Sequence, residues 1–168
     1  VDAARRVVKT TLGDFVGNVV NVIPPHRAPR LVAAAGLANA TNGRFAGVDV
    51  LSYESTVAPG VHVIGDASAT TQPKAGHIAN QEAKVCADAI TRALRGQTPD
   101  PAPVTNSACF SPITRDTASW LTVVFAYDAA SRTMKPVGGA ATEAATASKD
   151  NFEAMMKWFA TLMADSYT

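Results

Sequence analysis

Two cysteines, Cys86 and Cys109, are the residues whose side chains could carry redox chemistry in this 168-residue sequence. A thiolate attacks the sulfur of a disulfide, so a cysteine pair can accept and release two electrons. A disulfide between Cys86 and Cys109 is one possibility, but the sequence does not establish the geometry that such a bond requires. Cys86 falls within a predicted helix among inward-facing alanines, where a thiol behaves as a small apolar side chain.

A second candidate is the segment GVHVIGDA at positions 60–67. Its three β-branched residues between Gly60 and Gly65 predict a short buried strand. The strand would end at Gly65 and Asp66, where glycine lets a ligand approach the backbone and aspartate accepts hydrogen bonds from a hydroxyl group. An ordinary turn is the alternative, because Gly-Asp pairs are common in turns.

A helix of about 20 residues is predicted from Gly76 to Arg95, after a polar loop that contains Pro73. Pro73 suits the first turn of the helix and Gly96 suits its C-terminal cap. A helix N-terminus carries partial positive charge and free N–H groups, so it can hold a phosphate or an electron-rich ring edge. His77, near the start of the helix, is expected to be solvated rather than to contact a ligand.

These segments resemble one flavoprotein family. GVHVIGDA followed by QPKAGHIANQEAKV resembles the second flavin-binding signature of two-dinucleotide-domain flavoproteins, in the form found in the flavoprotein subunit of flavocytochrome c sulfide dehydrogenase. NVIPPHRAP at 21–29 and NSACFSP at 106–112 match the same family. The resemblance implies an α/β plus α+β fold of the glutathione-reductase-like type, with FAD as cofactor. The flavin-binding residues that it implies are Gly65, Asp66, Ala67, Lys74, Ala75 and Gly76.

The same resemblance divides the chain into three parts. Residues 1–25 would be the tail hairpin of an NAD-like domain, 26–98 the C-terminal part of the FAD-binding domain, and 99–168 a small α+β interface domain. The proline-rich stretch 97–103 is the predicted boundary before the last part.

The local patterns predict most of the regular elements. In the first two parts we expect strands at 5–11 and 15–23, a helix at 31–39 and a short strand at 49–51. The β-branched run within 15–23 predicts a strand that is buried on both faces. In the last part we expect strands at 104–111, 120–127 and 132–137, and an amphipathic helix at 149–167 with Ser148 as its N-cap.

The resemblance also implies a mechanism. Cys109 would be one of two redox-active cysteines beside the flavin, with its partner outside this chain, so Cys109 is expected here as a free thiol. Hydrosulfide would attack the disulfide of the full protein and leave a persulfide and a thiolate, and electrons would pass through FAD to a c-type cytochrome subunit in the periplasm. Trp158 would lie near the flavin as a second catalytic residue, and Lys74 would stabilise negative charge on a reduced flavin.

Composition narrows the classes of function. The net charge is +1 with scattered basic residues, which gives no reason to expect nucleic-acid binding. No apolar run approaches the ~18 residues of a membrane span, and no metal site is predicted. The phosphate-binding pattern G-x-G-x-x-G is absent. The resemblance, together with a first residue that is Val and not Met, implies the C-terminal part of a longer enzyme, with an incomplete FAD site and no activity alone.

Two other functions remain open from the sequence. A nicotinamide-dependent flavoprotein disulfide reductase or NADH dehydrogenase would share Gly65, Asp66 and the following helix, but would leave NSACFSP unexplained. The last 70 or so residues could instead be a non-enzymatic docking module for a partner subunit.

Overall fold

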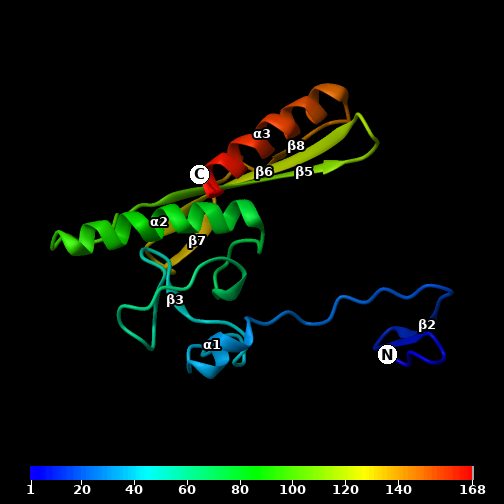
Figure 1. Cartoon of the computed structure of the whole chain (residues 1–168), viewed down its shortest axis with the longest axis horizontal. Helices are drawn as coiled ribbons and strands as arrows, with labels where there is room; N and C mark the ends of the chain where they lie inside the picture. Colours follow the sequence, from blue (N-terminus) through cyan, green and yellow to red (C-terminus); the bar gives the residue numbers. More distant parts are fainter. Residues whose placement is uncertain (168) are drawn as a thin grey trace.

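A four-stranded antiparallel sheet with a long helix on each side forms the C-terminal half of the molecule (Figure 1). The computed structural model describes residues 1–167. The sheet comprises β5 (Val104–Pro112), β6 (Ala118–Asp128), β7 (Thr133–Pro136) and β8 (Thr142–Glu143). The three predicted strands are confirmed as β5, β6 and β7, whereas the two-residue β8 was not predicted.

The register of the sheet brings chemically different residues into one row. Strand β6 pairs with β5 over residues 118–126, with β7 at its C-terminal end and with β8 at Leu121 and Thr122. Cys109 of β5 lies opposite Leu121 of β6, which in turn lies opposite Glu143 of β8. Residues paired in this way point to the same face of a sheet.

One face of the sheet carries helix α3 (Lys149–Tyr167), as predicted. The ring of Trp158 packs on that of Phe110 with their centroids 5.3 Å apart. The Trp120 indole N–H donates to the Asn151 side chain over 3.1 Å. The N–H of Asn151 donates to the hydroxyl of Ser148, which confirms Ser148 as the N-cap.

The opposite face contacts helix α2 (Gly76–Leu94) and the segments before it. Phe125 and Met134 are buried there with Ile78 of α2 and Val50 of the preceding loop. A second apolar cluster, built of Ala28, Val32, Leu37, Phe45 and Ala46, lies among the irregular segments nearer the N-terminus.

Helix α2 ends at its C-terminus as the sequence predicts. The left-handed Gly96, at φ +70°, follows the helix and donates its N–H to Ala93, while Gln97 donates to Arg92. This pair of hydrogen bonds is the Schellman motif, in which a glycine follows the last turn of the helix. Pro73, however, lies before the helix and not in its first turn, which begins at Gly76.

The predicted central strand between Gly60 and Gly65 is wrong. His62 makes only an isolated bridge to Glu54, and the local strand pair is β3 (Val48–Asp49) with β4 (Glu54–Ser55). A strand requires neighbours along its length, and within residues 1–167 this segment has only a short partner, with bonds between Val61 and Ser55 of β4 and between Val63 and Tyr53. Gly65–Ala67 forms a single 3₁₀ turn, η1.

The N-terminal segment also differs from the expectation. β1 (Val7–Thr10) and β2 (Gly13–Val16) form the predicted hairpin, but the second strand ends at Val16 and leads into an extended arm (Figure 1). Val19 is 90% exposed, so the expected strand buried on both faces is wrong within the described residues. Among residues 1–167 no strand pairs with this arm, although Arg6 bonds to its first residues, Gly17 and Asn18. Helix α1 (Arg30–Ala34) is shorter than predicted and is followed by the left-handed Gly36.

The described residues thus form a mixed α/β arrangement. Among residues 1–167, no helix combines the length and the apolar character needed to cross a lipid bilayer.

We predict that Gly65→Ala destabilises the protein more than Gly60→Ala. Both glycines are left-handed, with φ of +65° and +75°, so alanine costs roughly 1–2 kcal/mol of backbone strain at either position. A Cβ at Gly65 would also lie 3.1 Å from the Cβ of Ala79, whereas a Cβ at Gly60 meets nothing within 4 Å. Urea unfolding should therefore show about 1 kcal/mol of additional loss for Gly65→Ala. Equal losses would contradict tight packing between η1 and α2.

Candidate functional site

The turn that carries Gly65 and Asp66 is held against α2 by a buried carboxylate. Glu82 of α2 is 1% exposed, and it accepts the N–H of Gly65 over 2.5 Å. The hydroxyls of Ser68 and Thr70 also donate to it, over 3.5 and 3.3 Å. The turn therefore wraps around a side chain of the helix, which fixes where Asp66 and Ala67 lie.

Burial raises the pKa of Glu82, while the Gly65 N–H, the Thr70 hydroxyl and the nearby Lys74 act in the opposite direction. Sequence reasoning missed this residue. A signal was present, because Ile78, Glu82 and Cys86 follow each other at intervals of four along the buried side of α2. An acidic residue in a buried stripe requires hydrogen-bond partners.

Asp66 and Lys74 have different environments. The Asp66 side chain is exposed, and within residues 1–167 its carboxylate has no hydrogen-bond or ion-pair partner. The Lys74 ammonium donates to the backbone carbonyls of Asp66 and Ser68 over 3.0 and 2.7 Å, and it lies 4.2 Å from the centroid of the Phe45 ring. Lys74 therefore stabilises the turn, and its positive charge stays beside the start of α2.

The N-terminus of α2 is open. Ala75 occupies the N-cap position without a side-chain hydrogen bond, and a Cβ placed on Gly76 would meet nothing within 4 Å. Ala67 lies on the other side of the turn, where its carbonyl accepts the N–H of Ala46. The first N–H groups of a 19-residue helix are thus accessible to an acceptor.

Cys109 lies beside the same helix start. The N–H of Ala108, the residue before it, donates to Nδ1 of His77 over 2.9 Å, and His77 is the second residue of α2. The Cys109 side chain is exposed and its thiol is free, as predicted. The prediction that His77 is solvated is wrong, because His77 is partly buried and bonded to β5.

Cys86 is free and buried, which confirms its inward position. It follows His77 by nine residues, and a rise of 1.5 Å per residue separates the two by about 13 Å along α2. A disulfide needs Cα atoms roughly 5.5–6 Å apart, so Cys86 cannot be the partner of Cys109 in this arrangement. Burial also raises the pKa of the Cys86 thiol, which disfavours the reactive thiolate.

Trp158 joins α3 to this group of residues. Its ring lies 5.7 Å from that of His77 in an edge-to-face arrangement, and on its other side it packs against Phe110, which follows Cys109. Its indole N–H is buried and has no acceptor among residues 1–167.

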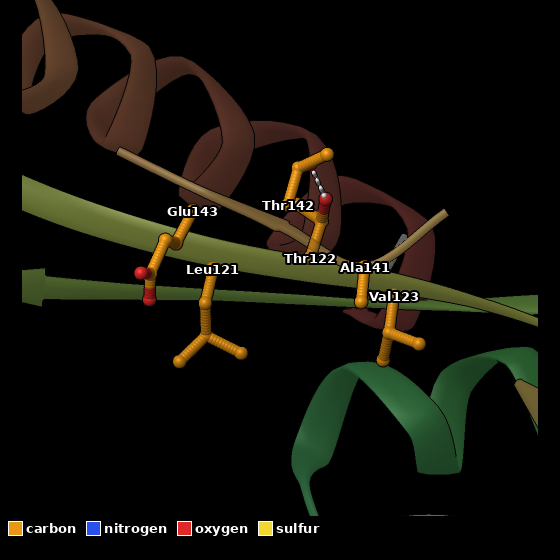
Figure 2. A pocket seen from close by; sticks show the side chains of 6 residues that line it. All are labelled: Leu121, Thr122, Val123, Ala141, Thr142 and Glu143. Carbon is orange, nitrogen blue, oxygen red and sulfur yellow. Dashed lines mark hydrogen bonds between the residues drawn. The ribbon is translucent and has the colours of Figure 1, made fainter. Parts of the chain in front are cut away.

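An open apolar hollow of about 360 Å³ lies on the sheet next to Cys109. Its lining residues are Leu121, Thr122, Val123, Ala141, Thr142 and Glu143. In Figure 2, Leu121 and Val123 point away from α3, while the hydrogen-bonded pair Thr122 and Thr142 points toward it. Leu121 is 51% exposed and shares a row with Cys109, so the hollow continues the surface that carries the thiol.

The structure thus gathers the predicted site residues around one helix start. Gly65, Asp66 and Ala67 lie on one side of α2, Lys74 to Gly76 lead into it, and Cys109 and Trp158 are linked to it through His77. Within the described part of the chain, no three His, Cys, Asp or Glu side chains gather into a potential metal site.

Comparison with known families bears on the C-terminal part of the chain. Residues 101–167 match the family model described as flavocytochrome c sulphide dehydrogenase, flavin-binding. The resemblance is therefore confirmed for this segment, which carries both Cys109 and Trp158. The matched domain is a flavin-binding one, which supports FAD as the cofactor and a flavoprotein oxidoreductase subunit as the class of protein.

We predict that Glu82→Gln changes how stability depends on pH. The pKa of Glu82 is raised on folding, so its contribution to stability is fully present below about pH 4.5, the unfolded value, and decreases as pH rises through the folded pKa. The wild type should therefore lose stability relative to Glu82→Gln as pH rises above 4.5. Urea titrations between pH 4 and 8 measure this, with Glu153→Gln on exposed α3 as the control. Parallel curves for wild type and Glu82→Gln would contradict the burial argument.

Proposed function

We propose that this chain forms the C-terminal part of an FAD-dependent sulfide dehydrogenase that passes electrons to a c-type cytochrome subunit in the periplasm. In the whole protein it would complete a two-dinucleotide-domain flavoprotein, with residues 1–25, 26–98 and 99–168 in the three parts described above. The family match of residues 101–167 supports the class of protein. The position of Cys109 supports the reaction.

The observation that carries the proposal is an exposed thiol next to an open helix N-terminus. Cys109 follows the residue whose N–H is bonded to His77 of α2, and it adjoins the apolar hollow at Leu121. A planar ring that rested on this surface would contact the sulfur, the helix start and apolar side chains together. Trp158 packs on Phe110, the residue after Cys109, and would support this surface from the side of α3.

The residues present fit a flavin. The partnerless Asp66 carboxylate would accept hydrogen bonds from hydroxyl groups, and the free N–H groups at Ala75–Gly76 would face an electron-rich ring edge. Lys74 would add positive charge at the same place. When bound, FAD accepts two electrons together and can release them one at a time.

The chain's own part in the reaction is at the sulfur of Cys109. In the oxidised protein Cys109 would form a disulfide with a cysteine outside this chain, since Cys86 is buried and too distant. Hydrosulfide attacks one sulfur of that bond, and a new S–S bond forms as the old one breaks. One cysteine then carries a persulfide and the other leaves as a thiolate. Re-forming the disulfide, with release of the outer sulfur as zero-valent sulfur, would free two electrons, which a bound flavin would accept.

A second feature supports a docking function for α3. The helix has no buried residue, and Phe152, Met156, Phe159 and Met163 form an apolar stripe beside the one that meets the sheet. Met156 is 50% exposed and Phe159 is 49% exposed. A run of exposed large apolar side chains at helical spacing is typical of a protein interface. We place the cytochrome subunit on this stripe.

Cys109→Ser should abolish sulfide oxidation by the flavoprotein that contains this chain, and Cys86→Ala should not. Serine keeps the size of the side chain but cannot form the disulfide that hydrosulfide attacks. Sulfide-dependent bleaching of the flavin in stopped-flow should fall by orders of magnitude in Cys109→Ser, with flavin still bound. Cys86→Ala should retain activity and lose about 1 kcal/mol of stability. Fast bleaching in Cys109→Ser would refute the assignment.

Phe159→Glu should weaken binding of the cytochrome subunit, and Ala160→Glu should leave it unchanged. The two substitutions add the same charge at neighbouring positions, but Ala160 lies off the apolar stripe. A charge within an apolar contact surface loses hydration on binding, so we expect at least a tenfold weaker Kd by calorimetry for Phe159→Glu. Equal effects of the two substitutions would move the interface elsewhere.

A further inference from the structure

His77 connects three elements that are distant in the sequence. It belongs to the first turn of α2, its Nδ1 accepts the N–H of Ala108 in β5, and its ring meets Trp158 of α3. The residue after Ala108 is Cys109. A single imidazole therefore lies between the helix start and the strand that carries the exposed thiol.

The hydrogen bond to Ala108 matters because β5 is at the edge of the sheet. Within residues 1–167, β5 pairs with β6 alone, so the N–H groups on its outer side have no strand to bond with. An edge without partners is the part of a sheet that shifts or frays most easily. His77 supplies the acceptor at Ala108, one residue before Cys109.

This bond is possible only for one state of the imidazole. Because Nδ1 accepts, the proton of the neutral ring must be on Nε2. A doubly protonated ring would present an N–H to the N–H of Ala108, and two donors cannot bond.

We propose that His77 is a positioning residue that holds the β5 edge, and with it Cys109, against α2 only while its imidazole is neutral. The alignment of Cys109 with the helix start is then lost in acid. The proposal depends on the proposed function only for the use that is made of Cys109, and the contact itself can be tested without flavin or sulfide.

The charged surroundings of His77 favour the neutral ring. Partial burial and the positive charge of Lys84 lower its pKa from 6.5. Lys84 forms an ion pair over 2.5 Å with Asp165 of α3, Lys74 precedes the helix, and Cys109 is the titratable group on β5. The contribution of the neutral ring to stability is therefore fully present above pH 6.5 and is lost as pH falls through the lowered pKa.

Two substitutions separate the hydrogen-bond acceptor at position 77 from the protonation of the imidazole. In His77→Asn the amide oxygen occupies the place of Nδ1 and does not protonate, whereas His77→Leu removes the acceptor. His62→Asn is the control, because His62 contacts the Ser52 carbonyl away from β5. Amide exchange of Ala108, measured by NMR from pH 5 to 8 and corrected for intrinsic rates, reports the contact. Alkylation of Cys109 by iodoacetamide in a Cys86→Ala background reports the thiol.

The wild type and His62→Asn should lose Ala108 protection by about tenfold as pH falls below the pKa of His77, the size of one hydrogen bond. His77→Asn should stay protected throughout, and His77→Leu should be unprotected throughout. The ratio of Cys109 alkylation rates between the wild type and His77→Asn should change over the same pH range. A pH-independent wild type, or His77→Asn that behaves as His77→Leu, would overturn the proposal. If Ala108 exchange behaves as expected but the Cys109→Ser variant still oxidises sulfide, the proposed function is refuted and the role of His77 is not.

Discussion

The buried carboxylate of Glu82 is the constraint on which the arrangement of the site depends. A carboxylate removed from water costs several kcal/mol unless donors surround it, and here those donors come from Gly65, Ser68 and Thr70. They can converge only if the chain turns tightly over α2. The left-handed Gly65, where a Cβ would lie 3.1 Å from that of Ala79, permits that turn. The carboxylate thus determines a loop that would otherwise have many conformations.

With the turn fixed on one side, α2 becomes the common wall of the site. Its polar inward residue holds the segment that carries Asp66, and its first turn holds β5 through His77. Both of these contacts are hydrogen bonds. The packing beneath α2, where Ile78 meets Phe125, is apolar. Apolar packing gives the helix its place on the sheet, and directional hydrogen bonds set the two functional segments relative to it.

The elements that could be predicted are those whose pattern is local. Helices α2 and α3 and the three longer strands follow from periodicity and from caps such as Ser148 and Gly96. The β-branched segments 15–23 and 61–64 mislead for the opposite reason, since a strand exists only where another strand lies beside it. The contacts of Glu82 and His77 could not be predicted, because their partners are distant in sequence. The functional role of Cys109 was predicted from the family resemblance and not from composition.

The exposure of Cys109 follows from where α2 begins. The helix starts at Gly76, three residues after Pro73, and it does not extend backward over this part of the sheet. Val123, in the row of Ser107, still packs near Ile78, but Leu121, in the row of Cys109, lies beyond the helix and is half exposed. One row of the sheet therefore separates buried core from open surface. Two cysteines of equal chemistry acquire opposite properties from this placement, one inside a helix stripe and one just past the end of its cover.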